Sequence, residues 1–317
     1  MKKYAFLFPG QGAQVHGMIK DICDAYPEAR QVVDEVSKIT GIDMPKLLWE
    51  SEASVLSRSD NSQLAITTAS VAVMKVLESK GIKPSAAMGF SLGEFPALYA
   101  AGVLSFEDLI KVVQKRGSIM QTTCENIAKA NEGHAPGMTA VLGLPPEKVV
   151  EIANGIDNAY AANMNSAKQT VVSGTFEALE KVEAAAKEAG ARRAVRLSVA
   201  GPFHCPLMQK AADNFEKALA DFTFNNPDKL LFSNVTGKKA DDGAEIKKNA
   251  VLHLTNPVQW TSEETVLADI IKNDADNEWV VIEPGVGAVL TGLWNKFEFG
   301  EITKCTAVNN AETLSQF

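Results

Sequence analysis

The sequence predicts an α/β fold in which a large domain, built on a central and mostly parallel sheet, carries an inserted ferredoxin-like small domain. Three observations indicate this fold. A short apolar run, 86–89, ends in a sharp turn at Ser91 that precedes helix-forming residues. Between 138 and 199 the pattern changes in the order β-α-β-β-α-β, which is the split βαβ arrangement. Further strand candidates follow residue 200. We therefore expect residues 1–126 and 201–317 to form the large domain and 127–200 the small one.

The first part of the large domain alternates apolar strands with helices. Residues 4–8 predict a buried strand that ends at Pro9-Gly10. Residues 61–80 predict a helix with one apolar face, and 92–101 a helix that stops at Gly102. A further helix is expected over 108–121, with Arg116 beyond its apolar cluster.

The small domain and the return to the large domain follow from the same signals. In the small domain we expect strands at 139–142, 159–163, 170–173 and 194–199 and helices at 145–156 and 175–188. In the large domain we expect strands at 230–235 and 279–282. The polar run 237–249 predicts a solvated surface excursion.

Composition narrows the class of protein. The net charge of −8 argues against a nucleic-acid surface, which needs a basic face. The four cysteines form no CxxC pair, so we expect no metal site and no redox dithiol. The apolar run near the N-terminus breaks at Pro9, too early for a signal peptide. No apolar stretch reaches the roughly 18 residues of a membrane span. A cytoplasmic enzyme that does not bind membranes is the expectation.

Ser91 is the strongest candidate for chemistry. It is the centre of Gly89-Phe90-Ser91-Leu92-Gly93, between a predicted strand and a predicted helix. Such a turn exposes a serine and aims backbone N–H groups at a developing oxyanion, and the glycines allow close backbone approach. The pentapeptide alone also occurs in ordinary turns. With its context it predicts a nucleophile that forms a covalent acyl intermediate.

A serine nucleophile needs a base, and the chain has four histidines: His16, His134, His204 and His253. His134 is expected in an exposed loop, and His16 follows the glycine-rich N-terminal loop. His204 lies in Gly201-Pro202-Phe203-His204-Cys205-Pro206, where the chain returns to the large domain. The prolines fix that backbone, so spacing favours His204 as the base. The alternative is a structural histidine at a domain boundary.

Two further features are ambiguous by themselves. The loop 8–14 can present backbone N–H groups to an anion, or it is simply a tight turn. Arg116 can pair with a carboxylate through its guanidinium, although the residue pattern alone favours a surface arginine.

Taken together, these segments resemble the malonyl-CoA:acyl carrier protein transacylase family over nearly the whole chain. Each matching segment could arise by chance, but the ordered set is specific. The segments are Phe8-Pro9-Gly10-Gln11-Gly12, Gly89-Phe90-Ser91-Leu92-Gly93-Glu94, Gln114-Lys115-Arg116-Gly117, Asn163-Met164-Asn165-Ser166, Gly201-Pro202-Phe203-His204, Asn256-Pro257-Val258-Gln259-Trp260 and Glu283-Pro284-Gly285-Val286-Gly287.

The resemblance implies an α/β-hydrolase-like large domain and a ping-pong transfer of malonyl from malonyl-CoA to the phosphopantetheine thiol of acyl carrier protein, in fatty acid biosynthesis. It implies that Ser91 is the nucleophile, His204 its base, and the N–H groups of Gln11 and Leu92 the oxyanion hole. Substrate-binding residues are expected to be Arg116, Asn163, Asn165, Phe203 and His253. The partners would be malonyl-CoA and acyl carrier protein, without a cofactor, and we expect a monomer.

The sequence departs from the family at three positions. Phe90 stands where histidine is common, and Ala167 replaces a common proline. His253 stands where the family has glutamine or asparagine, whose backbone carbonyl orients the catalytic histidine. A backbone role survives substitution, so we expect activity to survive, with a second imidazole beside His204.

Three alternatives to this function stay open. A serine hydrolase or thioesterase could use the same Ser91–His204 pair, although such an enzyme needs no cation like Arg116 in its acyl pocket. A trans-acting acyltransferase of a polyketide pathway would share the fold and chemistry and differ in its carrier. A carrier-binding module with a dead site is the third.

Overall fold

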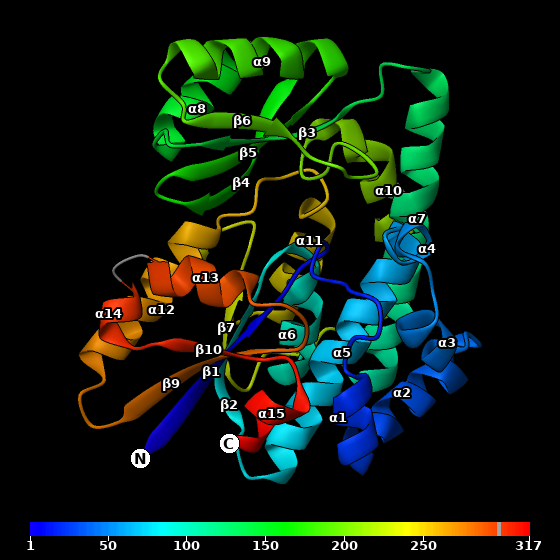
Figure 1. The fold of residues 1–317 in the computed structure, drawn as a ribbon, viewed down its shortest axis with the longest axis vertical. Helices are drawn as coiled ribbons and strands as arrows, with labels where there is room; N and C mark the ends of the chain where they lie inside the picture. Colours follow the sequence, from blue (N-terminus) through cyan, green and yellow to red (C-terminus); the bar gives the residue numbers. More distant parts are fainter. Residues whose placement is uncertain (297–298) are drawn as a thin grey trace.

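The computed structural model describes residues 1–296 and 299–317, and its strands form two sheets (Figure 1). The larger sheet has the order β10-β9-β1-β2-β7-β8, and the smaller sheet has the order β4-β5-β3-β6. The strands of the larger sheet are β1 (Lys2–Phe8), β2 (Pro84–Gly89), β7 (Leu230–Ser233), β8 (Lys238–Lys239), β9 (Glu278–Pro284) and β10 (Cys305–Val308).

The larger sheet is parallel except at one edge. Strand β1 pairs in parallel with β2 and β9, β9 pairs in parallel with β10, and β2 pairs in parallel with β7. Strand β8 alone pairs antiparallel, with β7. Residues Ala5–Phe8 of β1 are fully buried, as expected for a parallel strand covered on both faces. The predicted central, mostly parallel sheet is therefore confirmed.

The helices of the large domain pack around this sheet. Helix α5 (Ser59–Ser79) is buried over most of its surface and packs against α2 (Pro27–Thr40) and α7 (Phe106–Ala130). The sequence predicted one apolar face for α5, but small residues all around it let neighbours approach from several sides. The remaining helices are α1 (Lys20–Ala25), α3 (Met44–Trp49), α4 (Ala53–Leu56), α6 (Glu94–Ala100), α10 (Gln209–Ala218), α11 (Gly243–Leu252), α12 (Trp260–Asn273), α13 (Val289–Lys296), α14 (Phe299–Ile302) and α15 (Ala311–Ser315). Two short 3₁₀ turns are η1 (Ser91–Gly93) and η2 (Pro206–Met208).

The smaller sheet has the predicted βαββαβ order and lies at the top of Figure 1. Its elements are β3 (Gly137–Leu142), α8 (Pro146–Asn154), β4 (Ala159–Ser166), β5 (Gln169–Gly174), α9 (Phe176–Glu188) and β6 (Arg193–Arg196). All neighbouring strands pair antiparallel, and the two helices close a separate hydrophobic cluster over the sheet. Helix α7 runs through the expected domain limit at residue 126, so the domain limits stay a prediction.

The largest difference from the sequence analysis is the segment 237–249. Most of its residues are exposed, as predicted, but it contains β8 and the start of α11 and is not an irregular excursion. Helix α11 begins because the Asp242 side chain accepts the N–H of Glu245, and it buries Ile246 and Ala250. Smaller differences lie at element ends. The helix after Ser91 begins at Glu94, α7 continues to Ala130, and β6 ends at Arg196.

The two sheets are joined by hydrogen bonds between β4 and the segment before α12. The N–H of Met164 donates to the carbonyl of Val258 at 3.0 Å, and the N–H of Val258 donates to the carbonyl of Ala162 at 2.8 Å. The Thr261 hydroxyl donates to the carbonyl of Met164 at 2.8 Å. These bonds fix β4 beside the large domain and so fix the side chains that β4 contributes to the space between the sheets.

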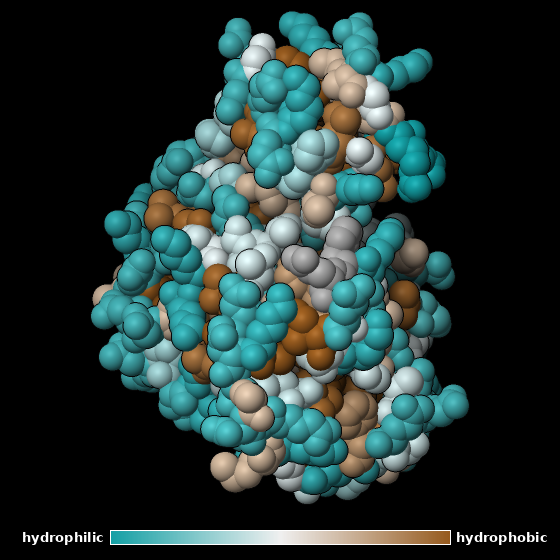
Figure 2. Space-filling view, turned by 90° about the vertical axis from the view of Figure 1, so that its left-hand side faces the viewer, coloured by the Kyte–Doolittle hydropathy of each residue, from teal (hydrophilic) through white to brown (hydrophobic). Residues whose placement is uncertain are grey.

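The surface in Figure 2 is mostly hydrophilic, as expected for a chain with 22% charged residues. Among the residues described, no helix has both the length and the hydrophobicity required to cross a bilayer.

Candidate active site

The turn at Ser91 is held in a conformation that favours glycine. Ser91 has φ 52°, in the left-handed region. A Cβ on Gly89 would lie 1.9 Å from the carbonyl oxygen of Gly93, and one on Gly93 would lie 2.0 Å from the carbonyl oxygen of Phe8. Both glycines are therefore required for the turn to close against the end of β1. The result presents Ser91 at the C-terminal edge of the parallel sheet, the usual place for a site in this architecture.

His204 meets Ser91 from a segment far away in the sequence. The Ser91 Oγ and His204 Nε2 lie 2.8 Å apart, and His204 Nδ1 lies 2.8 Å from the carbonyl oxygen of His253. A carbonyl only accepts hydrogen bonds, so Nδ1 carries the proton of the neutral ring. Nε2 is then the acceptor that faces the serine hydroxyl. This tautomer suits a general base for Ser91.

The surroundings keep His204 neutral. Burial lowers the pKa of His204 to about 4, and the nearby Arg116 charge lowers it further, while the His253 carbonyl acts in the opposite direction. The φ of His204 is 58°, so this backbone also lies in the left-handed region. An imidazole with a low pKa is unprotonated near neutral pH and can accept a proton.

Arg116 is not the surface arginine that its pattern alone favoured. Its side chain lies on α7 and is 1% exposed. Nη1 donates to Gln63 Oε1 at 2.7 Å, and the guanidinium lies 5.1 Å from the centre of the Phe95 ring. Nε and Nη2 have no hydrogen-bond partner among the residues that the structure describes. Burial lowers the pKa of Arg116 to about 10, which leaves it charged at neutral pH. A buried cation with two free N–H groups is strongly stabilised by an anionic ligand.

The nearest carboxyl group does not neutralise Arg116 fully. Glu94 begins α6, and burial raises its pKa to about 8, although the Asn234 backbone and the Arg116 charge act against this shift. Glu94 is therefore mostly protonated near neutral pH. Arg116 is therefore able to pair with the carboxylate of a bound ligand.

A cavity of about 420 Å³ is lined by Ser91, His204 and Arg116, and strands of the smaller sheet and turns and helices of the large domain complete its lining. Asn163 and Asn165 lie two residues apart on β4 and face it, and both are buried. The Asn165 Oδ1 has no hydrogen-bond partner. Phe203 and Phe90 form an apolar part of the wall. The Phe90 ring packs edge-on against Trp260, with the two ring centroids 5.5 Å apart. The floor of the cavity is thus polar and cationic, and part of its wall is aromatic.

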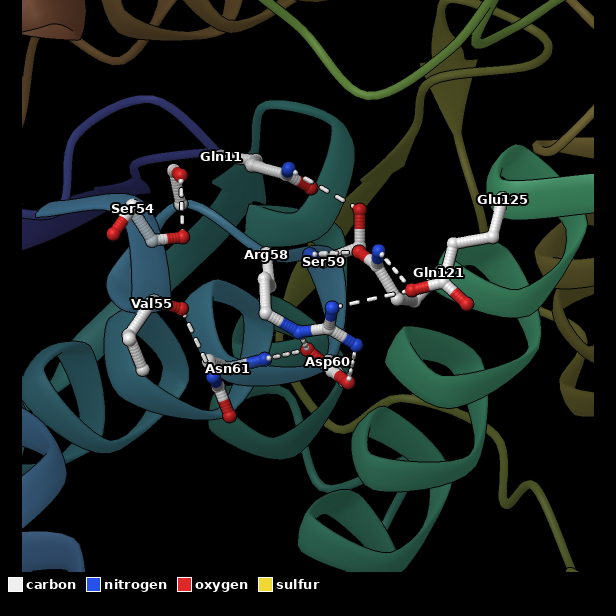
Figure 3. A network of polar contacts seen from close by, with 10 residues as sticks. Gln11, Ser54, Val55, Arg58, Ser59, Asp60, Asn61, Gln121 and Glu125 are labelled. Atoms are coloured by element: carbon white, nitrogen blue, oxygen red, sulfur yellow. Dashed lines mark hydrogen bonds and ion pairs between the residues drawn. The ribbon is translucent and has the colours of Figure 1, made fainter. Parts of the chain in front are cut away.

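One wall is a chain of hydrogen bonds (Figure 3). Gln11 Nε2 donates to Ser59 Oγ at 3.4 Å, the Ser59 N–H donates to Gln121 Oε1 at 2.8 Å, and Gln121 Nε2 donates to Glu125 Oε1 at 2.9 Å. Arg58 also lines the cavity, but Asp60 and Glu125 pair with it at 2.9 and 3.1 Å. The charge of Arg58 is therefore balanced, in contrast to that of Arg116.

Leu92 and Gln11 stand where an oxyanion could be bound. Leu92 lies in the first turn of a helical segment, where backbone N–H groups lack carbonyl partners within the helix. The N–H of Ser91 is occupied, because it donates to Asn234 Oδ1 at 2.7 Å. Of these two N–H groups of the turn, that of Leu92 is thus the one that can donate to the developing charge.

Two of the histidines, His16 and His134, lie away from the site, and a third, His253, lies behind it and not in the cavity. His16 Nδ1 contacts the carbonyl of Ser51, and His134 is exposed beside Glu177. His253 was expected to bind substrate, but its ring is fully buried and is not part of the cavity lining. The ring stacks on His204 with centroids 4.9 Å apart. His253 therefore lies behind the site, against His204 and with its Nδ1 3.4 Å from Glu94 Oε2.

Sequence reasoning missed the buried polar residues behind the site. Gln63 holds Arg116, and Asn234 contacts the Gly89 carbonyl and the Ser91 N–H in the turn. Glu94 was part of a quoted motif but had no assigned role. A signal for Asn234 exists, since it directly follows a parallel strand at the edge where sites form.

Comparisons with known proteins agree on one family. Residues 5–283 match the family model described as "Acyl transferase domain". The chain is 36% identical to the malonyl CoA-acyl carrier protein transacylase of Bacillus subtilis over 99% of this chain and 96% of that protein. The malonyl CoA-acyl carrier protein transacylase from Clostridium perfringens has a TM-score of 0.89 and 32% identity over 99% of this chain and 95% of that one.

A third relative carries a carrier protein. It is a malonyl-transacylase in complex with a type II PKS acyl-carrier protein, with a TM-score of 0.87 and 34% identity over 99% of this chain and 98% of that one.

Proposed function

The chain belongs to the acyl transferase family of the malonyl CoA-acyl carrier protein transacylases, and we propose that it transfers malonyl from malonyl-CoA to acyl carrier protein through an ester on Ser91. It is an acyltransferase. The observation that carries the residue roles is the 2.8 Å contact between Ser91 Oγ and His204 Nε2, beside a buried arginine with two free N–H groups.

In the first half-reaction Ser91 Oγ attacks the thioester carbonyl of malonyl-CoA while His204 Nε2 takes the hydroxyl proton. The carbonyl of His253 stabilises the imidazolium by accepting its Nδ1 proton. The N–H groups of Leu92 and Gln11 receive the oxyanion. When the tetrahedral intermediate collapses, the carbon–sulfur bond breaks, and the coenzyme A sulfur leaves with the proton from His204. The products are a malonyl-serine ester and free coenzyme A.

The second half-reaction runs the same chemistry with a different thiol. His204 takes the proton of the phosphopantetheine thiol of acyl carrier protein, and the sulfur attacks the malonyl ester. The Ser91 oxygen leaves and recovers its proton from His204. All of these groups come from one chain, which supports a monomer as the active unit and requires no cofactor.

Arg116 selects the acyl group and tunes the base. Its free Nε and Nη2 can hold the terminal carboxylate of malonyl in a bidentate pair. The Arg116 charge also lowers the pKa of His204, so a bound carboxylate offsets that effect and makes His204 a stronger base. An acetyl group supplies neither effect. Malonyl-CoA is therefore favoured both in binding and in the proton transfer.

The test follows coenzyme A release from malonyl-CoA with and without holo acyl carrier protein. A transacylase releases about one equivalent per protein without the carrier and turns over continuously with it. Continuous hydrolysis without the carrier would instead establish a thioesterase, and no release in either case a binding module with a dead site.

The relative bound to a type II PKS acyl-carrier protein favours one second candidate, an acyltransferase that serves a polyketide carrier. The chemistry on Ser91 is the same in both cases, and only the carrier differs. Transfer rates to a fatty acid carrier and to a polyketide carrier, measured side by side, decide between them. The expected cytoplasmic location stays a prediction.

A further inference from the structure

We propose that Asn234 is a positioning residue that holds the backbone leading into Ser91, from Gly89 to the Ser91 N–H, in its reactive conformation. This inference rests on the proposed role of Ser91 as the nucleophile. Asn234 directly follows β7, is fully buried and does not line the cavity. It acts through the backbone of the turn and touches neither the acyl group nor the base.

The side chain of Asn234 makes one hydrogen bond on each side of Phe90, the residue before the serine. Its Oδ1 accepts the N–H of Ser91 at 2.7 Å, and its Nδ2 donates to the carbonyl of Gly89 at 2.8 Å. The two hydrogen bonds hold the consecutive peptide groups that connect β2 to the turn. Fixing both of them fixes the direction in which the Ser91 side chain leaves the backbone.

These two hydrogen bonds take the place of backbone pairing between β2 and β7, which ends before it reaches the turn. Strands β2 and β7 pair through Ala86 with Leu230 and Ala87 with Leu231, and no further backbone pair follows. The side-chain amide of Asn234 has the same donor and acceptor as a peptide group, so it continues the ladder to Gly89 and Ser91. Left-handed backbone is strained for a residue other than glycine. The φ of 52° at Ser91 therefore needs such external support.

Glu263 on α12 and Gln259 just before that helix hold Asn234 in place. Asn234 Nδ2 also donates to Glu263 Oε1 at 2.8 Å, and the N–H of Gln259 donates to the Asn234 carbonyl at 2.8 Å. Burial and the neighbouring Glu94 raise the pKa of Glu263 well above its usual value. A rotated amide would aim its oxygen at the Gly89 carbonyl and its NH₂ group at the Ser91 N–H, so both bonds to the turn would be lost. The amide thus has one satisfactory orientation, and that orientation serves the turn.

The hydrogen bonds of Asn234 also determine which N–H group of the turn can bind the oxyanion. Because Asn234 Oδ1 occupies the N–H of Ser91, that N–H cannot also bind the developing charge. The donor from the turn is then the N–H of Leu92, whose direction depends on the same held backbone. Loss of the Asn234 contacts would misplace the nucleophile and the oxyanion donor together.

The test is Asn234→Asp, which keeps the shape but replaces the donor Nδ2 with an acceptor that faces Gly89 and Glu263. We expect the single-turnover rate of Ser91 acylation by malonyl-CoA at pH 8 to fall roughly 10²–10³-fold, the range seen when an oxyanion donor is lost. The apparent Kd of malonyl-CoA should change less than about 3-fold, because Asn234 does not line the cavity. Towards pH 5 a protonated Asp can donate one bond, so its rate relative to the wild type should rise at least about 10-fold.

The matched control is Asn295→Asp on α13. Asn295 makes the same kind of bidentate pair with a backbone, accepting the N–H of Cys305 at 2.9 Å and donating to its carbonyl at 2.8 Å, away from the cavity. We expect a similar loss of melting temperature and an unchanged acylation rate. Asn234→Ser, which is neutral and shorter, supplies a second variant should Asn234→Asp fail to fold. It should lose rate about 10–100-fold without a change in the Kd of malonyl-CoA.

Three results would overturn the inference: acylation by the Asn234 variants within about 2-fold of the wild type, a loss no larger than that of Asn295→Asp, or a loss carried by the Kd instead of the rate. A different result would remove its premise, namely a malonyl adduct that persists in Ser91→Ala. That outcome would contradict the proposed function, whereas the first three contradict only the role of Asn234.

Discussion

Replacing Arg116 with alanine should convert the preference for malonyl-CoA into near indifference between malonyl-CoA and acetyl-CoA. The guanidinium is 1% exposed, and its Nη1 is already used by Gln63. Nε and Nη2 are free to bind the malonyl carboxylate. Hydrogen bonds that involve a charged group contribute roughly 1.5–3 kcal/mol each, so two of them amount to about 3–6 kcal/mol. At about 1.4 kcal/mol per factor of ten, kcat/KM for malonyl-CoA should fall roughly 10²–10⁴-fold.

The same change should leave acetyl-CoA nearly unaffected, because an acetyl group has no carboxylate to lose a partner. The assay is the rate of Ser91 acylation from each thioester, followed by intact-protein mass. Arg116→Lys keeps the charge but not the planar pair, so it should fall between the two proteins. Arg196→Ala is the control, since Arg196 pairs with Glu183 outside the cavity. An Arg116→Ala protein that retains its melting temperature and its malonyl rate would refute the assignment.

Three further predictions concern the buried titratable groups. Because burial lowers the pKa of His204 to about 4, the acylation rate should hold from pH 8 to pH 5.5 and decline only towards pH 4; a decline centred near 6.5 would contradict this. Glu94 has a folded pKa of about 8 against an ordinary 4.5, so the folded state holds its proton more tightly and loses stability as pH rises from 4.5 through 8. Glu94→Gln, which cannot ionise, should flatten the fall of melting temperature over this range, and an unchanged slope would argue against it. His253→Gln keeps the carbonyl that holds His204 Nδ1, so kcat should change less than about 5-fold, or roughly 1 kcal/mol; a loss of 100-fold would assign a role to the imidazole.

Much of the fold was predictable because local signals and tertiary structure agree. The strand at 84–89 and the elbow at Ser91 follow from an apolar run flanked by glycines, and these glycines turn out to be required by contacts below 3 Å. The βαββαβ order follows from periodicity, capping residues and Gly190. Arg116 and His204 were reached through motifs, and the contact geometry then explains why these residue types are needed.

The remainder depends on contacts between distant segments. Nothing near Asn234 in the sequence indicates that its amide continues a strand ladder to Ser91, 143 residues away. The segment 237–249 is polar enough to suggest a loop, but Asp242 caps a helix there and two apolar residues suffice to anchor it. His253 was placed in the substrate site by resemblance, and only its position under His204 separates the role of its carbonyl from that of its ring.

The most direct test of the central claim is the mass of the intact protein after brief exposure to malonyl-CoA, followed by addition of holo acyl carrier protein. We predict one malonyl group per chain, located on Ser91 by peptide mapping and absent in Ser91→Ala. It should disappear from the protein and appear on the carrier thiol after the carrier is added. A protein that transfers malonyl to the carrier without ever carrying it on Ser91, or that carries it equally well in Ser91→Ala, would contradict the account.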